Sequence, residues 1–155
     1  MEISQTVITL ERPDSADARA LIAELEAELS VHYPPKSRHG YSVQKLIDQG
    51  VVFFVTRHGD APAGCGGIQL FGTDYGELKR MYVRPQFRGL GLGRLMLLLL
   101  EQHAREHGVG LVRLETGIHQ EAAIRMYERW GYVRIPPFPP YFEDPVSRCY
   151  ERRIG

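Results

Sequence analysis

The segment best suited to chemistry is a stretch in which glycines recur at every second position. Gly89, Gly91 and Gly93 lie between a strand-like segment and an apolar, helix-like segment. Glycine permits a positive φ and lets a ligand approach the backbone, and a helix N-terminus presents backbone N–H groups without partners. Together with the charges of Arg88 and Arg94, these groups predict a cradle for a pyrophosphate. The alternative is a tight strand-to-helix turn that binds nothing.

The spacing of these glycines excludes two well-known phosphate loops. A Walker loop ends in G-K-S/T, whereas Arg94 and Leu95 follow Gly93. The dinucleotide fingerprint places a third glycine three residues after the second, where this chain has Arg94. That fingerprint also opens a parallel βαβ unit, whereas this loop follows three strand-like segments. Neither a nucleoside triphosphate nor a dinucleotide is therefore the expected ligand.

The elements that must position this loop are predicted from hydrophobic periodicity and turn residues. The predicted strands span residues 3–10, 51–56, 64–71, 77–83, 111–115, 132–135 and 148–153. The predicted helices span about 15–30, 42–48, 92–107 and 119–130, the last with help from His119 at its start. A meander that feeds a β-α-β crossover implies an α+β fold with a mixed, mostly antiparallel central sheet flanked by about four helices. We expect one domain over residues 1–155.

Composition excludes several classes of protein. The chain has 155 residues, 43% of them apolar and 25% charged, which is typical of one globular domain and not of a disordered chain. Nineteen basic and nineteen acidic residues cancel, so a nucleic-acid partner is not expected. The longest apolar run, 95–100, is too short to span a membrane, and no signal peptide is evident. Cys65 and Cys149 are expected to be reduced thiols, which favours the cytoplasm.

Two histidines on one predicted helix raise the question of a metal site. His103 and His107 are four residues apart, as in the H-E-x-x-H zinc motif, but position 104 is alanine and no third ligand is evident. We therefore expect no metal.

Three segments resemble the GNAT family of N-acetyltransferases. Gln86-x-x-Gly89-x-Gly91 resembles the family's motif A, Q/R-x-x-G-x-G/A. Residues 116–132 resemble its second acetyl-CoA motif, N-x-x-A-x-x-x-Y-x-x-x-G-F/Y, with Gln120 in place of the opening asparagine. Residues 77–83 resemble its fourth strand, and the order of elements matches over nearly the whole chain. The resemblance implies a GNAT-type fold and acetyl-CoA as cosubstrate.

The resemblance also implies how the cofactor is held. Two strands of the fold splay at a bulge, where the pantetheine arm would pair with the backbone around Met81, Tyr82 and Val83, and Gln120 would help to hold that arm. The Met81 N–H would face the thioester oxygen as an oxyanion donor. Backbone N–H groups of the following residues would bind the pyrophosphate: Arg88, Gly89, Leu90, Gly91, Leu92, Gly93 and Arg94.

Two side chains occupy positions where the family often places proton-transfer groups. Glu77 would be the general base that deprotonates the amine; its alternative is a solvated strand-end glutamate paired with Lys79 or Arg80. If Glu77 is not the base, the candidates are His32, His39, Glu115 or water. Tyr127 would protonate the departing thiolate and would also hold the cofactor; its alternative is a core tyrosine.

The acceptor is expected opposite the cofactor, between two loops rich in prolines and aromatic residues, 32–39 and 136–145. Tyr33, Arg38, His39 and Tyr141 are the predicted substrate residues. Lys36, Arg38 and His39 could accept a carboxylate, which favours an amino acid over a polyamine. Ordinary turn chemistry is the alternative for both loops.

The leading hypothesis is transfer of an acetyl group from acetyl-CoA to a primary amine of a small molecule or amino acid, by direct attack in a ternary complex. One alternative is acetylation of a protein lysine or N-terminus, and another is a non-catalytic acyl-CoA sensor. The protein is expected to be a monomer or homodimer.

Overall fold

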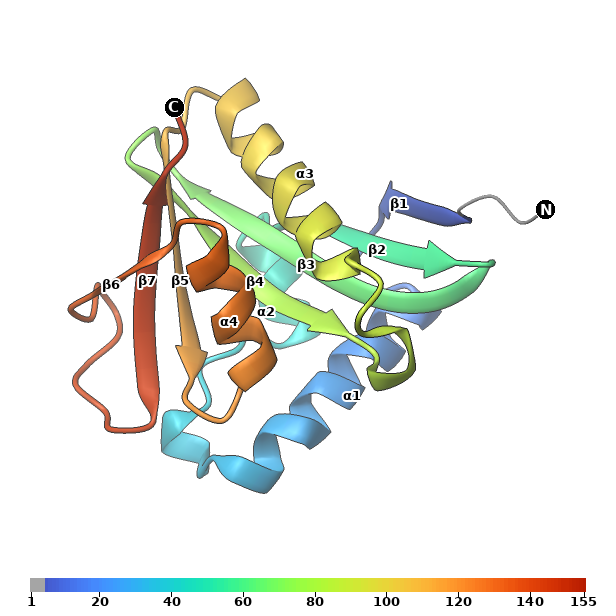
Figure 1. Cartoon of the computed structure of the whole chain (residues 1–155), viewed down its shortest axis with the longest axis horizontal. Helices are drawn as coiled ribbons and strands as arrows, with labels where there is room; N and C mark the ends of the chain where they lie inside the picture. The colour runs from blue at the N-terminus through green and yellow to red at the C-terminus, as the bar shows by residue number, and fades with distance from the viewer. Residues whose placement is uncertain (1–4) are drawn as a thin grey trace.

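The computed structural model describes residues 5–155, which form one seven-stranded sheet with helices on both faces (Figure 1). The strands are β1 (Thr6–Leu10), β2 (Val52–His58), β3 (Ala61–Phe71), β4 (Tyr75–Val83), β5 (Leu111–Gly117), β6 (Val133–Ile135) and β7 (Ser147–Arg153). The helices are α1 (Ala16–His32), α2 (Val43–Asp48), α3 (Leu92–Glu106) and α4 (Glu121–Arg129), with short turns η1 (Pro35–Ser37) and η2 (Pro85–Phe87). The strand order is β1-β2-β3-β4-β5-β7-β6, and only β4 and β5 are parallel. The mixed, mostly antiparallel α+β fold is confirmed.

Most predicted elements are found, with differences at their ends. The predicted first strand began at Ile3, which lies outside the described residues, and β5 runs two residues further than expected, to Gly117. Helix α4 begins at Glu121 and not at His119. The reason is that the Gln120 backbone is not helical, with φ −85° and ψ 61°, and its N–H closes a turn on the Gly117 carbonyl at 3.0 Å. The His119 N–H donates to the Tyr33 hydroxyl at 2.8 Å.

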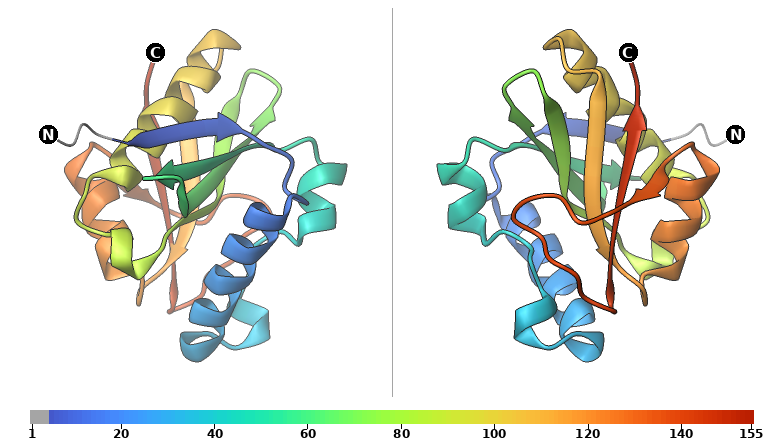
Figure 2. Two further views of the ribbon diagram at one scale, coloured as in Figure 1. Left: turned by 90° about the vertical axis from the view of Figure 1, so that its right-hand side faces the viewer. Right: turned by 90° about the vertical axis from the view of Figure 1, so that its left-hand side faces the viewer.

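The sheet separates two hydrophobic cores. Figure 2 shows α1 and α2 on one side of the sheet, and α3 and α4 on the other. Leu97 and Leu100 of α3 are fully buried in one core, and Leu21 of α1 is fully buried in the other. Because burying a leucine side chain contributes about 1.5–3 kcal/mol, these contacts fix both helix layers on the sheet.

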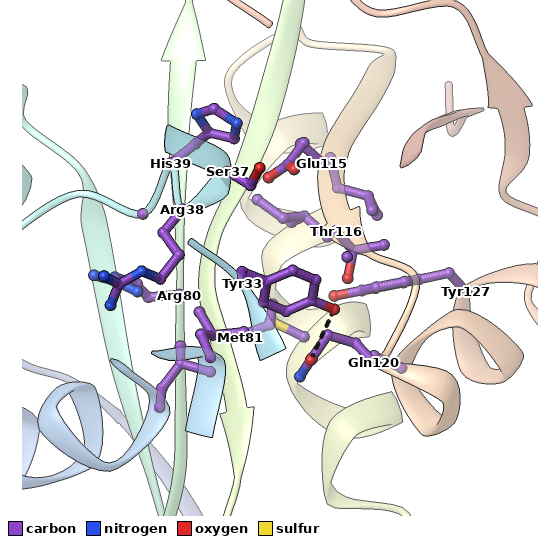
Figure 3. Close-up of a pocket in the computed structure, with 17 residues that line it drawn as sticks. Tyr33, Ser37, Arg38, His39, Arg80, Met81, Glu115, Thr116, Gln120 and Tyr127 are labelled. Carbon is purple, nitrogen blue, oxygen red and sulfur yellow. Dashed lines mark hydrogen bonds between the residues drawn. The ribbon is translucent and has the colours of Figure 1, made fainter. Parts of the chain in front are cut away.

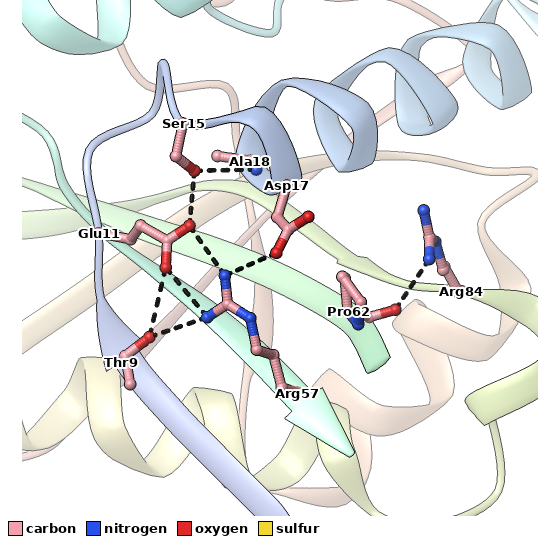
Figure 4. A network of polar contacts seen from close by, with 8 residues as sticks. All are labelled: Thr9, Glu11, Ser15, Asp17, Ala18, Arg57, Pro62 and Arg84. Carbon is pink, nitrogen blue, oxygen red and sulfur yellow. Dashed lines mark hydrogen bonds and ion pairs between the residues drawn. The ribbon is translucent and has the colours of Figure 1, made fainter. Parts of the chain in front are cut away.

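Helix α1 is anchored at its N-terminus by a polar network (Figure 4). The Ser15 hydroxyl caps the helix by accepting the Ala18 N–H at 3.1 Å. Arg57 of β2 donates to both carboxylate oxygens of Glu11, at 3.0 and 3.1 Å, and to Asp17 at 2.8 Å. This guanidinium lowers the pKa of the Glu11 carboxyl. The network joins β1, β2 and α1, and so fixes the helix whose far end reaches the site described below.

Strand β4 contains a bulge that changes which face its side chains occupy. Between the pairs Cys65↔Tyr82 and Gly67↔Lys79, two steps along β3 match three along β4. Arg80 takes up the extra step with a φ of +55°. As a result Tyr82 packs on the α1 side of the sheet, although Leu78, four residues earlier, packs on the α3 side.

The same strand separates from its parallel neighbour. The ladder between β4 and β5 holds only the pairs Gly76↔Val112 and Glu77↔Arg113. Beyond these pairs the two strands diverge toward their carboxyl ends, as Figure 1 shows. The divergence opens a wedge in the sheet, with α4 on one side of it and α1 on the other.

Candidate active site

Two cavities meet in the wedge between β4 and β5. The glycine-loop cavity, of about 1150 Å³, lies along the loop before α3 and along α4. The small cavity, of about 130 Å³, lies between β4, β5 and the segment from α1 to η1. Five residues line both: Leu25, Met81, Gln120, Ala123 and Tyr127. A group bound in one cavity can therefore touch a group bound in the other beside Met81 and Tyr127.

The glycine loop leaves the start of α3 open to a ligand. Gly89 and Gly91 have φ values of +86° and +79°, which favour glycine. A Cβ at either position would meet nothing within 4 Å, so the space above them is free. Gly91 precedes Leu92 as the N-cap and provides no capping side chain. Gly93 serves packing instead, because a Cβ there would lie 2.9 Å from the Met126 sulfur of α4.

The two arginines of the loop differ in how fully they are paired. Arg88 binds Glu28 at 3.0 Å and donates to the Val83 carbonyl at 2.8 Å. Arg94 lies 3.8 Å from the Trp130 ring centroid, and its buried Nη1 has no hydrogen-bond partner among the described residues. A buried donor without a partner, such as the Arg94 Nη1, beside an uncapped helix N-terminus indicates a site for an anionic ligand.

The wall of the glycine-loop cavity includes every residue predicted to bind the cofactor except Leu90, whose residue surface is 54% exposed. Gln120, which replaces the asparagine of the family motif, is held from two sides. Its Oε1 accepts the Tyr33 hydroxyl at 3.2 Å and its Nε2 donates to Glu28 at 3.1 Å. The longer side chain is therefore fixed at the junction of the cavities.

Three of the four predicted substrate residues line the small cavity: Tyr33, Arg38 and His39 (Figure 3). The fourth, Tyr141, is not in its wall; its ring packs against His39 with centroids 5.4 Å apart. Lys36 is exposed and lies outside the wall. The proline-rich loop of residues 136–145 thus contacts the cavity wall through Tyr141 and His39 and does not line the cavity there.

Glu77 matches neither sequence interpretation in full. It is only 1% exposed and lines neither cavity, so it is not a solvated strand-end residue. Its carboxylate binds Lys79 at 2.9 Å, a pairing that the alternative interpretation named, and it accepts the Tyr141 hydroxyl. Glu77 therefore does not face an amine in the small cavity directly, and its role as the base stays a prediction.

Glu115 of β5 is the carboxylate that lines the small cavity (Figure 3). Its pKa is raised to about 7, mainly by burial, and the charges of Glu77 and Asp144 contribute to this rise. The Ser147 hydroxyl, which donates to it at 2.7 Å, and the charge of Lys79 oppose the rise. A carboxyl that titrates near neutrality can accept a proton from an amine at physiological pH.

Tyr127 of α4 faces both cavities while remaining packed. It is 4% exposed, and its ring meets Tyr132 edge-on with centroids 5.7 Å apart. Burial raises the pKa of its phenol, so the hydroxyl stays protonated. Tyr127 is therefore both a packed core residue and part of the wall that the two cavities share.

Sequence reasoning gave little weight to two residues of the small cavity. Glu115 appeared only among several substitutes for the base, and Arg80 only as a partner for Glu77. The available signal was topological: ligands bind at the carboxyl ends of parallel strands, and Glu115 ends its predicted strand. The placement of Arg80 depends on the bulge of β4, which the family resemblance implies without locating it at Arg80.

No group of three or more histidine, cysteine or acidic residues within residues 5–155 could hold a metal ion. Over the same residues, no helix is long and apolar enough to cross a membrane.

Comparisons with known proteins agree on one family. Residues 18–132 match the model of the acetyltransferase (GNAT) family. A protein of Azospirillum brasilense named IAA acetyltransferase is 38% identical over 86% of this chain and 88% of its own. A crystal structure from Klebsiella pneumoniae, assigned as an acyl-CoA N-acyltransferase, is 37% identical with a TM-score of 0.81 over 97% of this chain and 98% of its own.

A more distant structure carries the cofactor. N-acetylglutamate synthase from Neisseria gonorrhoeae, in complex with coenzyme A and N-acetyl-glutamate, has a TM-score of 0.73. The match covers 96% of this chain and 35% of the synthase, at 20% identity, so it concerns the fold alone.

Proposed function

The chain belongs to the GNAT family of acetyltransferases, and we propose that it moves the acetyl group of acetyl-CoA to the primary amine of a small molecule within a ternary complex. The observation that carries the proposal is the meeting of the two cavities at Met81 and Tyr127. Direct transfer needs donor and acceptor in contact, and the junction allows that contact. Location in the cytoplasm and a monomeric or dimeric state remain predictions.

The residues of the glycine-loop cavity fit acetyl-CoA. The open start of α3 and the orphaned Nη1 of Arg94 suit a pyrophosphate, and the unpaired edge of β4 beyond Glu77 suits an extended arm that pairs as a strand does. When bound, acetyl-CoA supplies an activated thioester. Met81 lies at the junction, where its N–H would donate to the developing oxyanion.

The proton transfers are assigned to Glu115 and Tyr127. The ionised Glu115 accepts a proton from the acceptor ammonium, which frees the nitrogen lone pair for attack on the acetyl carbon. A C–N bond forms as the C–S bond breaks, and the electron pair of that bond leaves with sulfur. Tyr127 donates its proton to the thiolate and takes back the second proton of the attacking nitrogen, which leaves a thiol and a neutral amide. Its raised pKa keeps the phenol protonated before the transfer. Much of the rate would come from positioning, with no covalent enzyme intermediate.

The size of the small cavity favours a small acceptor over a folded protein. Its volume of about 130 Å³ is bounded by Tyr33, His39 and β5, which leaves little room for a polypeptide segment. An acyl-CoA sensor would not need a titrating carboxyl in the wall of the small cavity, and Glu115 therefore argues for turnover.

The proposal is tested by measuring thiol release from acetyl-CoA over a panel of primary amines, with mass spectrometry of the products. We expect an amine that gains one acetyl group for each thiol released. Tight binding of acetyl-CoA without turnover on any amine would favour the sensor, and acetylation confined to peptides would favour the protein-modifying alternative.

A further inference from the structure

We propose that the acceptor carries a carboxylate as well as its amine, and that Arg38 and Arg80 bind this carboxylate in the small cavity. The inference rests on the proposed function and narrows the acceptor to a small amino acid.

Both guanidinium groups line the cavity and both retain an unused donor. The Nε of Arg38 and the Nη1 of Arg80 are buried, and neither has a hydrogen-bond partner among the described residues. The Arg80 side chain is only 6% exposed. Because buried donors are nearly always paired in folded proteins, two orphans in one cavity wall indicate a missing acceptor.

The charges around these groups leave the arginine end of the cavity positive, opposite Glu115. Arg38 and Arg80 share a single carboxylate, Glu26, at 3.4 and 2.8 Å. The other contact of Arg80 is neutral, since its Nε donates to the Tyr41 carbonyl at 2.9 Å. Lys79, on the same strand, is already neutralised by Glu77. One positive charge therefore remains for a ligand, and a guanidinium fork binds a carboxylate better than a neutral group.

The position of Arg80 is specified by the backbone around it. Its φ of +55° belongs to the bulge of β4, a conformation that a non-glycine residue adopts at some cost. A Cβ added to Gly40 would lie 2.3 Å from the Arg80 Cζ, so that the loop after η1 packs its backbone directly on the guanidinium. The chain thus holds this arginine at the cavity by two independent features.

The small cavity also places the carboxylate-binding residues and the proton-transfer residues on opposite sides, as an acceptor with an amine and a carboxylate requires. Figure 3 shows Arg38 and Arg80 at one side and Glu115 and Tyr127 at the other. An amine directed toward Glu115 would leave a carboxylate on the same short molecule facing the arginines. A volume of about 130 Å³ suits a small amino acid.

The test compares L-amino acids with their primary amides, which have nearly the same shape but no negative charge. For the wild-type protein we expect kcat/KM to favour the acid by about tenfold or more, mainly through KM. Arg80→Gln and Arg38→Gln should each remove most of this preference. Lys36→Gln removes a charge from the same loop outside the cavity and should keep it.

The outcomes separate this inference from the proposed function. Equal acetylation of acids and amides by the wild-type protein would overturn the carboxylate site while the acetyltransferase activity stands. If no amine is acetylated, calorimetry on the CoA-saturated protein still compares N-acetyl amino acids with their amides, and equal binding would overturn the site independently. Should Arg80→Gln fail to fold, Arg80→Lys and Arg38→Gln serve the same comparison.

Discussion

The assignment of Glu115 as the base leads to a specific pH profile. Its pKa of about 7 means that the ionised fraction rises from about one tenth at pH 6 to about nine tenths at pH 8. Because the base must be ionised, kcat/KM at saturating acetyl-CoA should rise about tenfold across this range. A carboxyl of ordinary pKa would show no such rise.

The raised pKa of Glu115 also brings this carboxyl closer to the pKa of the acceptor ammonium. An alkyl ammonium has a pKa of about 10.4, so transfer to an ordinary glutamate is uphill by about 8 kcal/mol. Raising the carboxyl pKa from 4.5 to about 7 reduces this difference by about 3 kcal/mol. Glu115→Gln should therefore lower kcat/KM by about 10² or more at pH 7. The loss should shrink toward pH 10, where solvent deprotonates the amine.

The same group predicts an independent effect on stability. A carboxyl whose pKa is higher in the folded state binds more protons folded than unfolded between pH 4.5 and 7, so the free energy of unfolding falls as pH rises. Denaturant titration should show that the free energy of unfolding of the wild-type protein falls by up to about 3 kcal/mol across this window, relative to that of Glu115→Gln.

Glu77→Gln is the matched control. It should lower stability, because it leaves the buried Lys79 without its counter-charge. The remaining activity should still rise with pH, but at a lower pH than in the wild-type protein, because the Glu77 charge helps to raise the pKa of Glu115. The assignment to Glu115 would be refuted if Glu115→Gln kept the wild-type rise of kcat/KM with pH and Glu77→Gln lost it.

Three further predictions concern other parts of the structure. Tyr127→Phe keeps the buried ring, and kcat should fall about 10²-fold or more while calorimetry shows unchanged acetyl-CoA binding; equal losses in both would make Tyr127 a packing residue. Gly91→Val should raise the KM for acetyl-CoA at least tenfold, about 1.4 kcal/mol, whereas Gly50→Val, at a similar φ of +65° away from the cavities, should leave that KM unchanged. Arg57→Gln should lower the free energy of unfolding by about 1–2 kcal/mol at pH 7. Because the pKa of Glu11 is lowered, that difference should vanish as pH falls through the folded pKa of Glu11, and a pH-independent difference would contradict the network.

The fold could be predicted from local patterns because each element carries its own signal. Ser15 and Ser42 stand at the predicted helix starts, and both side chains cap their helices by accepting a backbone N–H. The glycine loop is equally local, since three glycines and a helix start suffice to predict it. These features depend on residues close in sequence.

The small cavity could be predicted only in part, because long-range packing decides which charges face it. The sequence names Lys79 or Arg80 as a partner for Glu77, and the structure shows Lys79, but the sequence does not show that Glu77 is buried away from the cavity while Glu115 lines it. The bulge at Arg80 sends residues on either side of it to opposite faces, and no residue type there indicates it. Tyr141 was expected in the cavity wall, yet its hydroxyl binds Glu77 instead.

The most direct test of the central claim follows the acetyl carbon itself. Acetyl-CoA labelled with ¹³C at the carbonyl is mixed with the protein and an amine acceptor from the panel, and NMR records the carbonyl signal over time. Direct transfer at the junction of the two cavities predicts that the thioester signal is replaced by an amide signal, and that Tyr127→Phe slows this replacement. Conversion of the label to acetate, or a thioester signal that persists with every amine, would contradict the account.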